Sequence, residues 1–299
     1  MKKIILDTDI GDDVDDALAL TFALLCGEIE VVGVTTVFRD TVRRAELACC
    51  VLDGLGRGDV PVYAGLGKPL FDNASKGRAA IETHRPRQME AIRQYPGPSR
   101  PAEGRAVDFI VDTVMGSDGD ITLVPIGPLT NIAAALTVAP RLAQKTTICL
   151  MGGCVGRMIA EWNILCDPEA AHVVFGAGVP ITMVGLDVTE ACRLDNTPVQ
   201  AIGSVDRPIN RLCFDLIQLW RKDSGREHPI LHDPLAIAMV FDPTFCETRS
   251  SAIHVETRSD RLNGATVRVR SDEFEANAEV CVDVDSERFV SYFVNTLTT

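Results

Sequence analysis

Residues 4–20 read IILDTDIGDDVDDALAL, and this stretch decides the fold class. A short apolar run ends at Asp7, a glycine turn follows, and an apolar helical pattern begins after Asp15 and Asp16. We interpret the run as a buried parallel strand and the later pattern as a helix. Ligands of open α/β sheets bind beyond the carboxyl ends of the strands, so this turn is the first candidate site.

Six aspartates lie between positions 7 and 16. At the short separations of a turn, like charges repel by about 1 kcal/mol or more per pair. Carboxylate oxygens in such number suit a hard cation such as calcium or magnesium. An N-cap beside an acidic surface turn is the alternative, but it accounts for one or two aspartates rather than six. The cluster therefore favours a metal site.

Composition narrows the class of partner. The chain has 299 residues, of which 46% are hydrophobic and 24% charged, a balance typical of a globular protein with a sizeable core. Its net charge of −13 argues against a nucleic-acid or anionic-membrane partner, because phosphates would be repelled. No apolar run reaches membrane-spanning length. A small neutral substrate is compatible with this charge.

Cysteine usage and the amino terminus point to one compartment. Ten cysteines are scattered without a C-x-x-C pair, and residues 1–3 lead into a strand without the apolar region of a secretory signal. We therefore expect a cytoplasmic protein whose thiols are reduced and mostly buried. No internal repeat or composition break marks a linker, so we expect one domain over residues 1–299.

Apolar, β-branched runs alternate with helical patterns along the chain. We expect strands at residues 4–7, 29–36, 59–65, 120–126, 146–151 and 181–185, and helices at 41–55, 103–115, 167–175, 208–221 and 234–241. This alternation predicts an α/β fold with a mostly parallel, doubly wound sheet flanked by helices. Further strands are expected within 252–284, and a closing helix at 286–297. The irregular residues 66–100 are interpreted as a flap, with a short helix near 87–95.

A second acidic position lies far along the chain, in the segment His232-Asp233-Pro234-Leu235-Ala236. The proline sets a first helical turn and places Asp233 beside the helix N-terminus. Taken alone, such a segment is usually a cap. Beside the N-terminal aspartates, Asp233 becomes a candidate distant metal ligand, and His232 a candidate proton donor because its free pKa suits acid catalysis near neutrality.

Three known acidic patterns resemble the start of the chain. An EF-hand loop counted from Asp7 needs glutamate at its twelfth position, where Leu18 stands. A phosphatase of the haloacid-dehalogenase type would use Asp7 as its nucleophile, but that family has Thr or Val where Gly11 stands. The third is the nucleoside hydrolase family, with Asp-x-Asp-x-Gly followed closely by Asp-Asp and an apolar helix.

The chain resembles the inosine-uridine preferring type of nucleoside hydrolase over nearly its whole length. Further segments similar to the family's occur in family order: Ile126-Gly127-Pro128-Leu129-Thr130-Asn131, Met151-Gly152-Gly153, Glu161-Trp162-Asn163-Ile164 and Asp167-Pro168-Glu169-Ala170-Ala171-His172. The resemblance implies Ca²⁺-dependent hydrolysis of the N-glycosidic bond of a ribonucleoside, giving free base and ribose. It also implies a homodimer or homotetramer.

By the same resemblance, the metal ligands would be Asp9, Asp16, Asp233 and the backbone carbonyl of Ile126, with the ribose 2′- and 3′-hydroxyls completing the shell. Asp15 would be the general base and contact a ribose hydroxyl. The C–N bond breaks through an oxocarbenium-like state, so carboxylates stabilise the charge that develops on the sugar.

The remaining roles concern the substrate. Glu161 and Asn163 would hold the 3′- and 5′-hydroxyls, Trp162 would line the ribose pocket, and His232 would assist departure of the base. His84 in the flap would touch the base.

The chain departs from the family pattern at several positions. Two more residues than in the commonest motif separate Gly11 from Asp15, so Asp13 is an alternative for the role given to Asp15. Asp40 replaces a frequent asparagine near the substrate, and the asparagine expected after Gly152-Gly153 is absent. A metal-loaded nucleoside-binding homologue that has lost hydrolysis is therefore a second hypothesis. The sequence does not distinguish purine from pyrimidine substrates.

Overall fold

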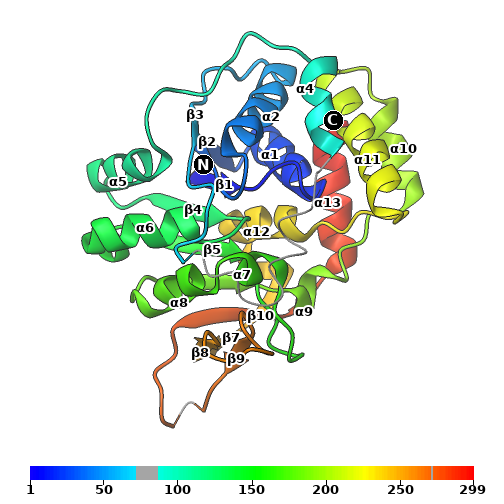
Figure 1. The fold of residues 1–299 in the computed structure, drawn as a ribbon. Coiled ribbons are helices and arrows are strands. Elements are labelled where there is room, and N and C mark those ends of the chain that lie inside the picture. Colours follow the sequence, from blue (N-terminus) through cyan, green and yellow to red (C-terminus); the bar gives the residue numbers. More distant parts are fainter. Residues whose placement is uncertain (72–86, 271) are drawn as a thin grey trace.

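The computed structural model describes residues 1–71, 87–270 and 272–299 (Figure 1). Its centre is an eight-stranded sheet of order β3-β2-β1-β4-β5-β6-β10-β7, and β7 alone among these strands runs antiparallel to its neighbour. The strands are β1 Lys2–Thr8, β2 Ile29–Thr36, β3 Val62–Ala64, β4 Ile121–Pro125, β5 Thr147–Met151, β6 Ile181–Val184, β7 Cys246–Ser251 and β10 Ala278–Val284. A separate antiparallel pair consists of β8 Ile253–Val255 and β9 Thr266–Arg268.

Helices cover both faces of the sheet (Figure 1). They are α1 Asp15–Leu25, α2 Thr41–Gly54, α4 Ala91–Gln94, α5 Ala106–Gly116, α6 Thr130–Val138, α7 Trp162–Cys166, α8 Pro168–Gly176, α9 Leu186–Thr189, α10 Asn196–Ser204, α11 Pro208–Ser224, α12 His232–Phe241 and α13 Ser286–Thr298. In the view of Figure 1, α5, α6 and α8 lie to the left of the sheet, whereas α1, α11 and α13 lie to its right.

The side chains of β1 show why both faces are covered. Ile4 and Leu6 belong to an apolar cluster that includes Leu20 of α1. Ile5 between them belongs to a second cluster that includes Ile132 of α6. Successive side chains of a strand point to opposite faces, so a continuous apolar run requires helices on both sides. The doubly wound, mostly parallel architecture predicted from the sequence is confirmed.

The order of the strands places a switch point at β1. The chain moves from β1 outward to β2 and β3, then returns to form β4, β5 and β6 on the other side of β1. Asp7 pairs with Pro125 in the parallel ladder of β1 and β4, and Ile126 N–H donates to the Asp7 carbonyl at 2.8 Å. Loops that leave adjacent parallel strands in opposite directions open a crevice between them. Asp9 and Ile126 follow these two strands directly.

Some helices and strands differ from those predicted, because a proline shortens one strand and some helices are very short. Strand β3 is shorter than the predicted 59–65, since Pro61 has no N–H to contribute to the ladder. Strand β7 begins at Cys246, ahead of the predicted tail. Helices α7 and α9 were not predicted, because elements of five and four residues are too short to display a helical period.

The segment interpreted as a flap is described only in part. Its later portion forms a 3₁₀ turn at Arg87–Glu90 followed by α4, in agreement with the short helix expected near 87–95. Residues 72–86, which include His84, lie outside the described residues. The role of the flap therefore stays a prediction.

The cysteines and the helix lengths agree with the compositional expectations. All ten cysteines fall within the described residues and are buried free thiols. Burial raises the pKa of Cys149 to about 12, so its thiol stays protonated. Across residues 1–71, 87–270 and 272–299, no helix has both the length and the apolar character needed to cross a membrane.

Candidate active site

Three buried carboxylates meet at the carboxyl end of β1. Asp15, Asp16 and Asp233 each offer an oxygen, and these oxygens lie within 4.8 Å of one another. Each of the three residues is at most 3% exposed. Asp15 and Asp16 form the first turn of α1, and Asp233 lies in the first turn of α12. Free N–H groups and the helix dipole favour negative charge at both places.

Hydrogen bonds fix the orientation of these acids. Thr8 donates its hydroxyl to Asp16 Oδ1 at 2.5 Å and accepts the Ile10 N–H at 3.0 Å. The backbone N–H of Asp233 donates to Asp15 Oδ2 at 3.2 Å. The second contact joins segments from opposite ends of the sequence, so α1 and α12 present their N-termini to the same point.

The electrostatics of the cluster call for a cation. Burial raises the pKa values of Asp15, Asp16 and Asp233 well above the usual range, and the neighbouring carboxylates raise them further. Burial also raises the pKa of Asp9 to about 7, against the opposing effect of the Arg44 guanidinium. Ionised carboxylates so close together are stable only with a compensating charge. An all-oxygen donor set of this kind fits a hard divalent ion such as Ca²⁺ or Mg²⁺.

A cavity of about 470 Å³ opens above the acids, which is large enough for a small metabolite. Among the residues that the structure describes, its walls include most of the side chains singled out in the sequence: Asp9, Asp13, Asp15, Asp16, Ile126, Glu161, Trp162, Asn163, His232 and Asp233. Arg226, Trp220 and Gln88 also line it. The cavity therefore brings together residues that lie far apart in the sequence.

One wall of the cavity is built around α7. The Glu161 carboxylate caps this helix by accepting the N–H groups of Asn163 at 2.9 Å and Ile164 at 3.2 Å, and it accepts Gly153 N–H at 3.0 Å. Asn163 donates its amide N–H₂ to the carbonyl of Ile126 at 2.8 Å. These bonds hold both polar side chains in place in the cavity wall. Glu161 Oε2 accepts two of the N–H groups, whereas Oε1 accepts one and keeps a further lone pair for a ligand.

Close packing beside Asp9 requires a glycine. A Cβ added at Gly127 would lie 2.8 Å from Asp9 Oδ1 and 2.9 Å from Asp9 N. Only a residue without a side chain lets the loop after β4 approach Asp9 this closely. The Gly-Pro-Leu-Thr-Asn segment thus contributes shape as well as the Ile126 carbonyl.

His232 lies at the edge of the acidic cluster. Its Nδ1 is hydrogen-bonded to the hydroxyl of Thr189 at 2.7 Å, which leaves Nε2 as the ring nitrogen available to a ligand. Burial lowers the pKa of His232 to about 4, so the free imidazole is neutral near pH 7.

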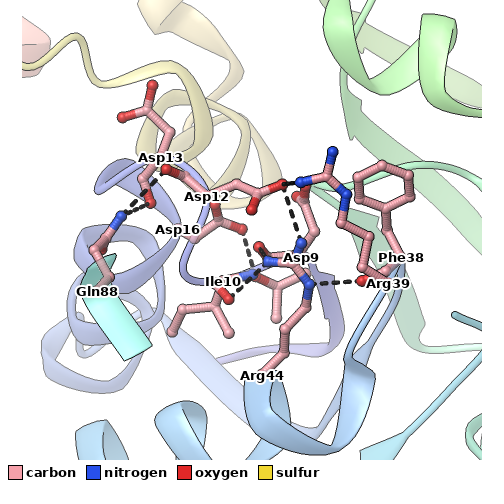
Figure 2. A network of polar contacts seen from close by, with 10 residues as sticks. Asp9, Ile10, Asp12, Asp13, Asp16, Phe38, Arg39, Arg44 and Gln88 are labelled. Carbon is pink, nitrogen blue, oxygen red and sulfur yellow. Dashed lines mark hydrogen bonds and ion pairs between the residues drawn. The ribbon is translucent and has the colours of Figure 1, made fainter. Parts of the chain in front are cut away.

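Four sequence-predicted positions do not belong to the three-acid cluster. Asp13 lines the cavity, but Figure 2 shows its carboxylate turned away from Arg44. Trp162 is 39% exposed. Asp40 is exposed and caps α2 by accepting Arg43 N–H at 3.2 Å, outside the described cavity wall. His84 lies outside the described residues.

The position of Asp7 bears on the phosphatase hypothesis. Asp7 is fully buried and accepts hydrogen bonds from the Thr35 hydroxyl at 2.6 Å and the Asn131 amide at 2.8 Å. It does not reach the described cavity wall. A phosphatase nucleophile must meet its substrate, so this placement removes the residue that the hypothesis requires.

Sequence reasoning missed several residues around the site, and Arg44 is the clearest case. It is 1% exposed and contacts the loop that carries Asp9. Its position gave a signal, because Arg44 shares the i, i+3, i+7 stripe of α2 with the buried Leu47 and Val51. A charged residue on an apolar stripe must be paired inside the protein. Trp220 is 5% exposed and also lines the cavity.

Comparison with known proteins covers almost the entire chain. A family model for inosine-uridine preferring nucleoside hydrolases matches residues 4–291. The chain is 35% identical to the pyrimidine-specific ribonucleoside hydrolase RihA of Shewanella sp. (strain ANA-3), across 99% of this chain and 96% of that protein. It is 33% identical to the pyrimidine-specific ribonucleoside hydrolase RihB of Escherichia coli O9:H4 (strain HS), across 96% and 94%.

A solved structure agrees with the sequence matches. The purine-preferring ribonucleoside hydrolase from Gardnerella vaginalis superposes with a TM-score of 0.85 and 30% identity, covering 99% of this chain and 98% of that one. The family and fold predicted from the aspartate cluster and the His-Asp-Pro segment are thereby confirmed. The chain belongs to the inosine-uridine preferring nucleoside hydrolase family.

Proposed function

We propose that the protein is a Ca²⁺-dependent ribonucleoside hydrolase that cleaves the N-glycosidic bond and releases free base and ribose. The observation that carries the proposal is the buried group of Asp15, Asp16 and Asp233 at the floor of a cavity that also reaches His232. The named relatives, which are ribonucleoside hydrolases, support the reaction type.

The proposed metal ligands are Asp9, Asp16, Asp233 and the carbonyl of Ile126. The first three are buried carboxylates beside one another, and the Ile126 carbonyl lines the same cavity. Bound there, the ion would lower the pKa of a water and orient the ribose hydroxyls. Ca²⁺ is preferred to Mg²⁺ in this proposal because Ca²⁺ takes several oxygen ligands in a flexible geometry, whereas Mg²⁺ usually keeps several waters and is held by one or two carboxylates.

We assign the general base to Asp15 rather than Asp13. Asp15 belongs to the three-acid cluster and accepts the Asp233 N–H, which holds it next to the metal ligands. Asp13 is not one of the three acids whose oxygens meet, although its charge raises the pKa of Asp15. Burial raises the pKa of Asp13 itself, against the opposing effects of the Val14 N–H and the Arg226 charge. A base must lie beside the water that it deprotonates, so the geometry favours Asp15.

Glu161 and Asn163 would bind the sugar. The Glu161 carboxylate accepts backbone N–H groups and the Asn163 amide donates to the Ile126 carbonyl, so both side chains are oriented before substrate arrives. Ribose 3′- and 5′-hydroxyls donate to such acceptors without rearrangement. Trp162 would cover the sugar from the mouth of the cavity. The carboxylates of the floor would stabilise the positive charge that develops on the ring as the C–N bond breaks.

His232 would assist departure of the base. If the Thr189 hydroxyl donates to Nδ1, Nε2 carries the hydrogen of the neutral ring. That N–H would donate to a ring nitrogen or oxygen of the leaving base and stabilise its developing negative charge. Thr189 would thereby set the tautomer, which is a role that the sequence alone did not suggest.

The direct test is release of free base and ribose from a panel of purine and pyrimidine ribonucleosides. Turnover that a chelator abolishes and Ca²⁺ restores is expected. Both base classes belong in the panel, since one relative is named pyrimidine-specific and another purine-preferring. Metal-loaded protein without turnover on any nucleoside would contradict the catalytic claim.

The binding homologue is separated from the enzyme by calorimetry. Tight nucleoside binding without hydrolysis would favour the homologue that has lost activity. The homo-oligomeric state and the cytoplasmic location stay predictions of the sequence. Sedimentation analysis would measure the first, and cell fractionation the second.

A further inference from the structure

A buried arginine, Arg44, lies against the loop that carries Asp9 and Asp12 (Figure 2). Arg44 comes from α2 and donates from Nε to the Phe38 carbonyl at 2.7 Å. Its Nη1 donates to the carbonyls of Ile10, at 2.9 Å, and Asp9. Its Nη2 forms an ion pair with Asp12 Oδ2 at 3.0 Å. The whole fork of the guanidinium is therefore engaged, and three of its acceptors belong to the loop after β1.

These bonds connect two irregular backbone segments. Residues 9–12 carry the proposed ligand Asp9, and Gly11 among them has φ of 109°. Phe38 and Arg39 have φ of 70° and 61°, which is the left-handed region that favours glycine and strains other residues. Such strain persists only where surrounding contacts impose it, and it gathers at functional sites. Arg44 bridges the two segments.

Other contacts fix the second segment to the chain after β3. Phe38 N–H donates to Leu66 O at 2.8 Å, and Arg39 N–H donates to Gly67 O at 2.7 Å. The Arg44 guanidinium carbon lies 5.8 Å from the centre of the Phe38 ring. The Phe38 carbonyl is thus a fixed anchor. An arginine bound to it at Nε has little freedom left at Nη1, which in turn fixes the carbonyls of Asp9 and Ile10.

The positive charge of Arg44 would repel a metal ion bound nearby. Its position beside the proposed metal site therefore needs a physical reason. Its guanidinium is close enough to Asp9 and Asp16 for its charge to lower both of their pKa values, although burial and the neighbouring acids raise both overall. A cation beside a cation site weakens metal binding unless it is neutralised. Asp12 provides that neutralisation at 3.0 Å, where an unpaired buried arginine would be costly.

We propose that Arg44, paired with Asp12, is a positioning residue that fixes the backbone of residues 9 and 10 and so aims Asp9 at the metal site before the metal binds. This inference rests on the metal site of the proposed function. Arg44 contacts no substrate in it, and it acts through the loop geometry. Its planar fork, rather than its charge, is the property that matters.

The planar fork and the positive charge of Arg44 predict opposite effects on Ca²⁺ affinity, so two substitutions at this position separate them. Arg44→Lys keeps the positive charge but loses the planar set of donors. We expect its Ca²⁺ affinity to fall at least 10-fold, measured by calorimetry on metal-stripped protein whose fold is checked by near-UV circular dichroism. Arg44→Gln removes the charge as well. If charge were the dominant property, Arg44→Gln would bind Ca²⁺ more tightly than wild type, and that result would overturn the proposal.

The neighbouring residue supplies the matched control. Arg43 lies on the same helix, its side chain is 43% exposed, and its ion-pair partner is Glu46 at 4.0 Å. Arg43→Lys makes the same chemical change outside the network, so unchanged Ca²⁺ affinity is expected. Equal losses in Arg43→Lys and Arg44→Lys would mean that the effect is not specific to the loop, and would also overturn the proposal.

A second variant keeps the test decisive if Arg44→Lys does not fold. Asp12→Asn keeps the arginine but removes the carboxylate that holds its Nη2, so the fork can shift and the carbonyls of Asp9 and Ile10 with it. Loss of one negative charge weakens Ca²⁺ and Mg²⁺ binding equally, whereas a displaced ligand changes their ratio, because the two ions demand different geometries. We expect the Ca²⁺/Mg²⁺ affinity ratio to change at least 3-fold. An unchanged ratio would overturn the proposal.

The outcomes also distinguish this inference from the proposed function. Wild-type protein that binds no Ca²⁺ would defeat the metal-dependent function itself. Wild-type protein that binds Ca²⁺, with unchanged affinity in Arg44→Lys, would defeat only the positioning role of Arg44.

Discussion

Asp16 and Asp233 each destabilise the metal-free protein, but together they supply ligands for a metal ion. Each is buried, and the Asp16 carboxylate raises the pKa of Asp233. Thr8 orients Asp16, and the Asp233 N–H orients Asp15. A buried acid among like charges destabilises the metal-free fold, and the same acid stabilises the metal-bound fold. Stability and metal affinity should therefore respond to these residues in opposite directions.

Asp16→Asn and Asp233→Asn test this opposition. Loss of a direct ligand should lower Ca²⁺ affinity by more than ~100-fold, since even outer partners of metal ligands are worth 10–100-fold. Hydrolysis should be lost together with the metal. The metal-free variants should nevertheless unfold at a temperature ~1–4 °C above the metal-free wild type, because like-charge repulsion is relieved. Calorimetry and thermal unfolding measure the two quantities.

An exposed acid provides the control for that experiment. Asp108 on α5 pairs with Arg105 at the surface, far from the cluster. Asp108→Asn should change neither Ca²⁺ affinity nor the metal-free unfolding temperature beyond a small surface effect. Asp16→Asn protein that still binds Ca²⁺ as tightly as wild type would exclude Asp16 from the ligand set.

His232→Ala should separate acid assistance from metal binding. Ca²⁺ affinity should stay within a factor of about 3, while kcat falls by roughly 10²–10⁴, the usual contribution of a general acid. The loss should be small for a riboside whose leaving group needs no protonation. Thr189→Val, which removes the hydrogen bond at Nδ1, should show a weaker form of the same pattern. Release of the metal by His232→Ala would contradict the role given to His232.

At the scale of elements, the site depends on how helix starts and strand ends converge. The N-termini of α1 and α12 meet where β1 ends. The short α7, capped by Glu161, forms another part of the cavity wall. The loop after β4 passes within contact of Asp9 because Gly127 has no side chain. The N-termini of α1 and α12 each contribute two polar side chains to the cavity wall.

Gly127→Ala should disturb the site without a change of charge. The added Cβ would lie 2.8 Å from Asp9 Oδ1, closer than real Cβ contacts, so either Asp9 or the loop after β4 must move. Ca²⁺ affinity and kcat/KM should each fall ~10-fold or more. Gly116→Ala at the end of α5 is the control, because nothing lies within 4 Å of its new Cβ. Full activity in Gly127→Ala would show that the close packing beside Asp9 is not required.

At the scale of the whole molecule, the sheet acts as a rigid frame with its ligand site at the carboxyl ends of the internal strands β1 and β4. Apolar clusters on both faces fix β1, β4 and α12 relative to one another. The strand order reverses at β1, which opens the crevice that the carboxylates line. A metal that joins groups from both ends of the chain must then stabilise the fold globally.

Ca²⁺ should raise the unfolding temperature of the entire protein. An ion that binds only the folded state stabilises it by about 2.7 kcal/mol at 100 times its Kd. For a chain of this size the shift should be several degrees, and a chelator should reverse it. Differential scanning calorimetry of stripped and Ca²⁺-loaded protein makes the measurement. Identical unfolding temperatures in both states would argue that no cation binds the folded cluster.

Much of this fold was predictable from local patterns. The β-branched run at 29–36 and the strand before Asp7 gave a parallel sheet, since only strands buried on both faces are apolar throughout. The short helices α7 and α9 were not predictable, because they lack a full period. Asp40 was assigned to substrate by resemblance, but its side chain caps α2, as aspartate before a helix commonly does.

The sequence by itself determined the family, the doubly wound architecture and the acidic residues that gather at the end of β1. The architecture and the acidic turn follow from period and spacing, which are local properties of the chain, and the family follows from the resemblance of its motifs. Only the tertiary structure decided that Asp233 meets Asp15, that Asp7 is sealed away from the cavity, and that Arg44 supports the Asp9 loop. Such contacts depend on how distant segments pack, and no local pattern encodes the distance between them.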